Sequence, residues 1–136
     1  MSTKNLTSIK VISSRKEQFI DVTGEIAAFV KKTGVSNGIC LVHVPHTTAA
    51  VTINENADPD VKRDMITVLE GLVPDDPAYR HAEGNSPAHV KSSLIGCSLN
   101  ILVTQGQLVL GTWQGIYFCE FDGPRSRKVN MKVMEG

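Results

Sequence analysis

Residues 98–134 read SLNILVTQGQLVLGTWQGIYFCEFDGPRSRKVNMKVM and contain four β-type runs separated by turn residues. These runs are 98–104, 107–112, 115–121 and 127–134. In the last run Val129, Met131 and Val133 alternate with polar residues, which indicates a strand with one buried face and one wet face. This part of the chain therefore predicts an antiparallel sheet.

Upstream of this stretch the pattern mixes short strands with helices. Strands are expected at 7–13, 17–22, 39–44 and 49–53. Asp58-Pro59 and Ser86-Pro87 each combine a capping residue with a proline at the first helical position, so each pair predicts the start of a helix. These two helices are expected to end before Pro74 and Gly96. A further helix is expected at 24–33, and 74–85 reads as an ordered loop. The fold class is therefore α+β: a compact antiparallel sheet or sandwich with about three helices packed on it.

Composition favours one globular domain covering 1–136. The 136 residues include 14 basic and 14 acidic residues, and this balance argues against nucleic-acid or membrane-surface partners. No apolar run resembles a signal peptide or a membrane span, so a cytoplasmic location is expected. Cys40, Cys97 and Cys119 are widely spaced in apolar surroundings, and we expect them to be buried, reduced thiols.

Three short segments carry residues that could form a polar pocket. His46 follows a strand end at Pro45, and hydroxyl, amide and carboxylate groups follow it within twelve residues. His81 lies in the loop and His89 in the helix, so a loop that folds back over the helix N-terminus would bring both imidazoles together. Free N–H groups at that helix end would attract an anion. The third segment, 111–128, holds the single tryptophan and two arginines suited to phosphate or carboxylate.

Each of these residues also has a plain structural interpretation. Asp58 would serve as a helix cap, and His43 would be a satisfied sheet histidine. Trp113 would be a core anchor, and the turn containing Arg125 and Arg127 would be a solvated basic turn. Phosphate-loop, dinucleotide and nucleophile-elbow motifs are absent, so the residues alone predict a pocket without naming a reaction.

The segments HTTAAVTINENADPDV (46–61), HAEGNSPAHVKSSLIG (81–96) and LGTWQGIYFCEFDGPRSRKV (110–129) together resemble the YjbQ-type family, a secondary thiamine-phosphate synthase family. The resemblance implies a small α+β fold that assembles as a homotrimer, with pockets near the subunit interfaces. It also implies that His46, His81 and His89 converge on a divalent metal, expected to be zinc, with magnesium as the alternative. Three imidazoles with an open fourth position would suit catalytic zinc. The other residues that the resemblance assigns to the pocket are Thr47, Thr48, Asn54, Glu55, Asp58, Glu83, Asn85, Trp113, Gln114, Glu120 and Arg125.

The implied activity joins hydroxymethylpyrimidine diphosphate to thiazole phosphate and releases pyrophosphate, as a weak or secondary reaction. The metal and Arg125 would neutralise the diphosphate, and Trp113 would stack on an aromatic ring. Two alternatives stay open: a metal-dependent hydrolase of a small anion with Glu55 or Glu83 as base, and a non-catalytic metal- or metabolite-binding trimer. The catalytic candidates are Glu55, Glu83, His89 and Arg125.

Overall fold

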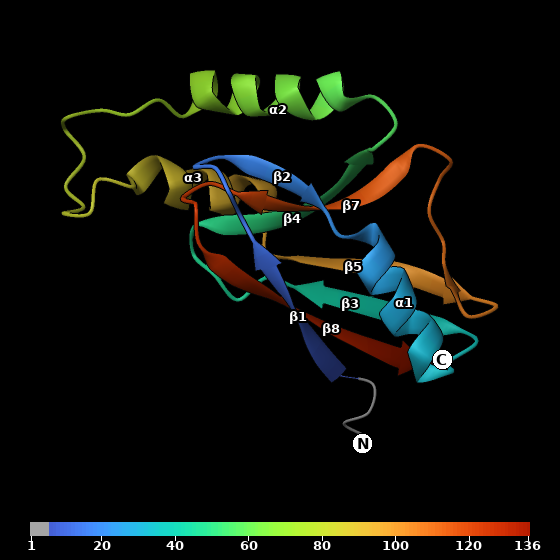
Figure 1. Ribbon diagram of the computed structural model, residues 1–136. Coiled ribbons are helices and arrows are strands. Elements are labelled where there is room, and N and C mark those ends of the chain that lie inside the picture. The colour runs from blue at the N-terminus through green and yellow to red at the C-terminus, as the bar shows by residue number, and fades with distance from the viewer. Residues whose placement is uncertain (1–5) are drawn as a thin grey trace.

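The computed structural model describes residues 6–136, which form eight strands and three helices (Figure 1). The helices are α1 (Thr23–Thr33), α2 (Pro59–Leu72) and α3 (Ser86–Ile95). The strands are β1 (Leu6–Ile12), β2 (Gln18–Asp21), β3 (Gly38–His43), β4 (Ala49–Glu55), β5 (Ser98–Thr104), β6 (Gln107–Leu108), β7 (Gln114–Glu120) and β8 (Ser126–Glu135). The predicted α+β fold is confirmed, and β6 is shorter than expected.

The strands pair into two antiparallel sheets. One has five strands in the order β1-β8-β3-β5-β6, and the other has three in the order β2-β7-β4. The interior strands β8 and β7 lie late in the chain and pair with strands from its first half. In each sheet, a strand from the C-terminal part of the chain therefore lies beside strands from the N-terminal half.

Strand β7 is buried on both faces because it lies between two hydrophobic cores. Ile116 and Phe118 point into the core between the sheets, which α1 closes at one side. Tyr117 and Cys119 point to the other face, where Leu69 of α2 and the N-terminal half of α3 cover the three-stranded sheet (Figure 1). The molecule thus has three layers: the five-stranded sheet, the three-stranded sheet, and the layer of α2 and α3.

The helix boundaries test the capping signals directly. The Asp58 side chain accepts a hydrogen bond from the Asp60 N–H at 2.9 Å, so its predicted capping role is confirmed. Helix α3 is capped at Asn85 rather than Ser86, and the Asn85 side chain makes no capping bond; its Nδ2 donates to Asp122. Gly34, in the left-handed conformation at φ 75°, ends α1 as expected.

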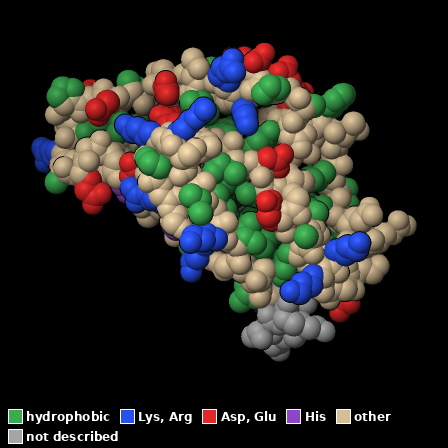
Figure 2. Space-filling view, in the orientation of Figure 1, with side chains coloured by type: hydrophobic (Ala, Val, Ile, Leu, Met, Phe, Trp, Pro, Cys, Tyr) green, Lys and Arg blue, Asp and Glu red, His purple; other side chains and the backbone are tan. Residues whose placement is uncertain are grey.

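The remaining surface is mixed in character. Lys and Arg side chains are interspersed with Asp and Glu over the face in Figure 2, together with separate hydrophobic side chains. Cys40 and Cys119 are buried, but Cys97 is exposed at the end of α3, so the expectation of three buried thiols is wrong for Cys97. Within residues 6–136, none of the helices combines the length and hydropathy needed to cross a bilayer.

Candidate functional site

The N-terminal end of α3 brings two histidines together. The His81 and His89 rings lie with their centroids 5.2 Å apart and their planes at 89°. A tight turn causes this, because the Gly84 N–H donates to the His81 carbonyl at 3.1 Å and Gly84 adopts a φ of 73°. The loop therefore folds back on the helix in the way the sequence predicted.

The backbone of this helix end offers fewer donors than expected. The Ala88 and His89 N–H groups both donate to the Asn85 carbonyl, at 3.0 and 3.4 Å, and Pro87 has no N–H. Three of the first four helical positions therefore present no free N–H to a ligand. The prediction of an anion site built from backbone amides is wrong in this respect, and anion binding here falls to side chains.

An arginine and a carboxylate adjoin the same helix end. The Asn85 Nδ2 donates to Asp122 Oδ2 at 2.7 Å, and the Arg125 guanidinium donates to the Asp122 carboxylate and carbonyl at 3.0 and 2.9 Å. The Ser13 hydroxyl oxygen accepts from the Arg125 N–H at 2.9 Å and fixes the turn. The Arg125 side chain is 49% exposed and uses only Nε and Nη2, so its other N–H donors face solvent and can reach an anion.

A fully buried ion pair lies beneath this turn. Arg127 donates to both oxygens of Glu120, and its Nη2 also donates to the Thr48 hydroxyl at 2.8 Å. Burial alone would raise the pKa of Glu120, but hydrogen bonds from Arg127, Ser13 and the Asp122 N–H lower it below its ordinary value. Because Glu120 and Thr48 are committed to this network, they support the site from below instead of facing a ligand.

His46 does not join the histidine pair in the described arrangement. Its Nε2 accepts from the Lys128 N–H at 3.0 Å, and a neutral imidazole has only that one nitrogen lone pair. Burial, together with the charge of Arg127, lowers the pKa of His46. Over residues 6–136, three or more His, Cys, Asp or Glu side chains are nowhere grouped in a way that could hold a metal ion.

The other predicted pocket residues form two groups, and one of these groups lies at the far end of strand β4. Thr47 is exposed just before this strand, and Glu83 is exposed in the turn between the two histidines. Asn54, Glu55 and Asp58 lie at or beyond the far end of β4. Gln114 pairs with Glu55 there, and the Trp113 carbonyl accepts from the Asn56 N–H. Seven strand residues span roughly 20 Å, so these five residues are far from the α3 site within one chain.

The residues at the far end mostly serve local structure. The Asn54 Oδ1 accepts from the Glu55 N–H at 2.7 Å, and the Gln114 Oε1 accepts from the Gly111 N–H at 2.8 Å. Trp113 is 62% exposed, which excludes the core-anchor interpretation. Tryptophan is enriched at protein interfaces, so the exposed indole is a candidate contact for a ligand or a second protein.

Sequence reasoning missed two polar pairs. Arg127 lies in phase with Val129, Met131 and Val133, so the alternation that predicted the buried face also placed it inside. The pair of Lys91 with Glu17, at 2.7 Å, had no sequence signal, because 74 residues separate the partners.

Comparisons with known proteins agree with this architecture. The family model described as UPF0047 protein YjbQ-like matches residues 7–136. The chain belongs to this family. UPF0047 protein YugU of Bacillus subtilis is 49% identical over 130 residues, which is 95% of this chain and 98% of that protein.

Other relatives extend the family across bacteria and archaea. A UPF0047 protein of Methanocaldococcus jannaschii is 47% identical, covering 96% of this chain and 95% of that protein. Among solved structures, an uncharacterized YjbQ/UPF0047 protein from Clostridium acetobutylicum superposes with a TM-score of 0.92 at 52% identity, covering 94% of this chain and 99% of that one. A YbjQ-like protein of unknown function from Sulfolobus solfataricus has a TM-score of 0.92 at 31% identity, with 96% of both chains covered. These solved structures therefore share the fold over 94–96% of this chain.

Proposed function

We propose that this UPF0047 protein is a cytoplasmic transferase of the thiamine-phosphate synthase type, with low activity, acting at a metal and anion site centred on His81 and His89. The observation that carries the proposal is the pairing of these two imidazoles at the helix end to which Asp122 and Asn85 link Arg125. Metal ligands and a guanidinium at one helix end are the groups that a diphosphate substrate requires.

The histidine pair fits a divalent metal. Two imidazoles bound through nitrogens at about 2.0–2.1 Å to one tetrahedral zinc have ring centroids roughly 5 Å apart, and the observed separation is 5.2 Å. Zinc accepts imidazole readily, whereas magnesium prefers oxygen ligands, so zinc is the favoured ion and magnesium the alternative. A bound metal would neutralise negative charge on the leaving diphosphate.

Side chains near the start of α3 would orient the substrate. Asp122 holds Arg125 through two hydrogen bonds and at the same time fixes Asn85, the cap residue of α3. This arrangement keeps the guanidinium at the end of the helix that carries His89. We assign Arg125 to the substrate diphosphate and Asp122 to positioning, since Asp122 acts through the arginine.

The residues at the far end of β4 fit the proposal only if a second copy supplies them. We therefore propose a homotrimer in which Trp113, Asn54 and Glu55 of one subunit approach the α3 site of a neighbour. Exposed apolar side chains support assembly: Leu102 is 63% exposed and Met134 is 44% exposed on the outer face of the five-stranded sheet. His46 would join the metal only after releasing the Lys128 N–H.

A metal-dependent hydrolase is the second candidate. Glu83 is exposed within the turn that joins the two histidines, which is where a general base for metal-bound water is required. A Glu83→Gln variant separates the two reactions, because the hydrolase needs this base and the transferase does not.

The proposal is tested by assaying thiamine phosphate formation from hydroxymethylpyrimidine diphosphate and thiazole phosphate with added zinc or magnesium. His89→Ala and Arg125→Ala should each reduce turnover at least tenfold. His43→Gln is the matched control, because His43 lies in β3 and contacts Asn130 instead of the site. Equal turnover in all four proteins would reject the transferase assignment.

A further inference from the structure

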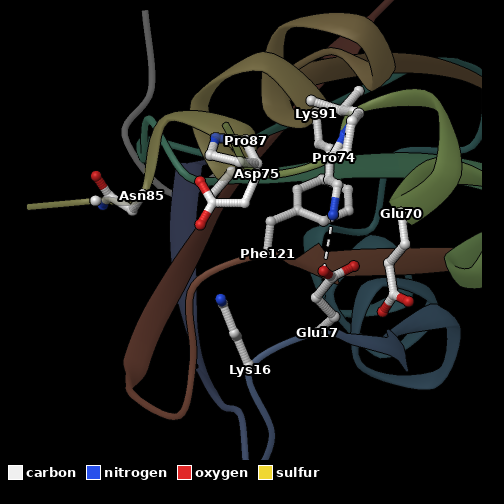
Figure 3. A pocket seen from close by; sticks show the side chains of 12 residues that line it. Lys16, Glu17, Glu70, Pro74, Asp75, Asn85, Pro87, Lys91 and Phe121 are labelled. Atoms are coloured by element: carbon white, nitrogen blue, oxygen red, sulfur yellow. Dashed lines mark hydrogen bonds and ion pairs between the residues drawn. The ribbon is translucent and has the colours of Figure 1, made fainter. Parts of the chain in front are cut away.

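A cavity with charged and apolar walls lies against α3. Its volume is about 310 Å³, and Figure 3 shows its lining from the turn before β2, the C-terminal end of α2, and α3 itself. Lys91 lines this cavity, and it lies two residues after His89, about 200° around the helix. Neither His81 nor His89 lines the cavity, although Gly84 and Asn85 border both the cavity and the histidine pair.

A buried ion pair forms one wall. The Lys91 Nζ lies 2.7 Å from Glu17 Oε1, and the side chains are only 4% and 13% exposed. The second oxygen, Glu17 Oε2, is buried and has no hydrogen-bond partner among the described residues. In Figure 3 this oxygen is on the side facing Glu70. A buried carboxylate oxygen without a donor is costly, so a turn of the Glu17 side chain that exposes this oxygen to a donor in the cavity would be favourable.

The charges around the cavity do not balance. Lys16 and Lys91 contribute two ammonium groups, whereas Glu17, Glu70 and Asp75 contribute three carboxylates, which leaves one negative charge uncompensated. Asn85, which also lines the cavity, has a second buried acceptor atom without a partner, its Oδ1. The lining therefore presents an excess of one negative charge and two unpartnered acceptor atoms, which favours a ligand with N–H donors and a positive charge.

The remaining lining is apolar and would accept a hydrocarbon body. Val73, Pro74, Pro87 and Phe121 form these walls. We infer that this cavity binds a small organic primary ammonium, whose N–H groups donate to Glu70 and, once the Glu17 side chain turns toward the cavity, to Glu17 Oε2, while its carbon atoms contact the apolar walls. The cavity would hold roughly ten water molecules at about 30 Å³ each, so it suits a ligand of about ten non-hydrogen atoms.

The test is a nuclear magnetic resonance titration of the full chain with phenethylammonium chloride, following backbone amide signals. Saturable shifts are expected in 16–17, 70–75 and 84–91. 2-Phenylethanol replaces the ammonium with a neutral hydroxyl at the same size, and should bind at least tenfold more weakly. Glu17→Gln and Glu70→Gln should each weaken phenethylammonium binding at least tenfold, because each removes one negative charge from the cavity.

Two further variants keep the test informative if Glu17→Gln does not fold. Glu70 is exposed on α2, so Glu70→Gln keeps the buried pair intact even if Glu17→Gln unfolds. Asp64→Asn removes the same charge from α2 outside this cavity and should leave binding unchanged. The inference is overturned if phenethylammonium produces no saturable shifts, which leaves only water in the cavity. Equal binding of 2-phenylethanol overturns it as well, and so do the same shifts with sodium or magnesium chloride alone.

Discussion

Replacing Arg127 with methionine gives the sharpest test of the buried support beneath the site. The guanidinium makes two bonds to Glu120 and two to Thr48, and all four would be lost. Glu120 has no exposed surface, so its carboxylate would stay buried without a counter-charge. Breaking a buried pair from one side costs about 3–5 kcal/mol of unfolding free energy, out of a total of about 5–15 kcal/mol for a typical domain.

The assay is equilibrium urea unfolding at neutral pH, with the double variant Glu120→Gln/Arg127→Met as the matched control. Neutralising both partners removes the unpaired charge, so the double variant should recover at least half of the lost free energy. A loss below about 1 kcal/mol in Arg127→Met would refute the reasoning, because a surface pair is worth no more than that. A double variant no more stable than the single would refute it too.

The same pair predicts a pH dependence with a definite sign. The folded pKa of Glu120 lies below its ordinary 4.5, so the pair stabilises the protein above that pH and the contribution is lost as acid protonates the carboxylate. In Arg127→Met the unpaired carboxyl is relieved by protonation. The difference in unfolding free energy between wild type and Arg127→Met should therefore shrink from pH 7 to pH 4.

Three further changes test other parts of the account. Asp58→Ala should lower the unfolding free energy by about 1 kcal/mol in urea, through loss of the α2 cap. The pKa of His46 lies below its usual 6.5, so wild-type stability should fall as pH drops below that value, and His46→Gln should flatten the curve between pH 5 and pH 7 in thermal unfolding. Gly115→Ala would place a Cβ 2.5 Å from the Asn56 Nδ2 and should cost about 1–3 kcal/mol, whereas Gly24→Ala meets nothing within 4 Å and should not destabilise the fold.

Most helices and strands could be predicted from the sequence because their ends depend on interactions between neighbouring residues. The Asp58-Pro59 start of α2 and the glycine end of α1 depend on neighbouring residues only. The sequence did not distinguish Asn85 from Ser86 as the cap of α3, because both residue types favour that position. The bond of Asn85 to Asp122, 37 positions away, had no sequence signal. The strand order was likewise hidden, since β1 pairs with β8 across nearly the whole chain.

The candidate site was predicted in part for the same reason. The meeting of His81 with His89 depends on a short turn at Gly84, which the sequence displays. The position of His46 depends on a backbone N–H from β8, which no spacing reveals. Trp113 was ambiguous because a tryptophan suits both a core and an exposed binding surface, and only the packing of β7 decides between them.

Direct zinc titration by calorimetry tests the central claim most plainly, with apo protein and no substrate. The account predicts saturable binding of one zinc per chain, lost in both His81→Ala and His89→Ala and retained in His43→Gln. Zinc binding of equal strength in all four proteins, or none in the wild type, would contradict a metal site at the end of α3.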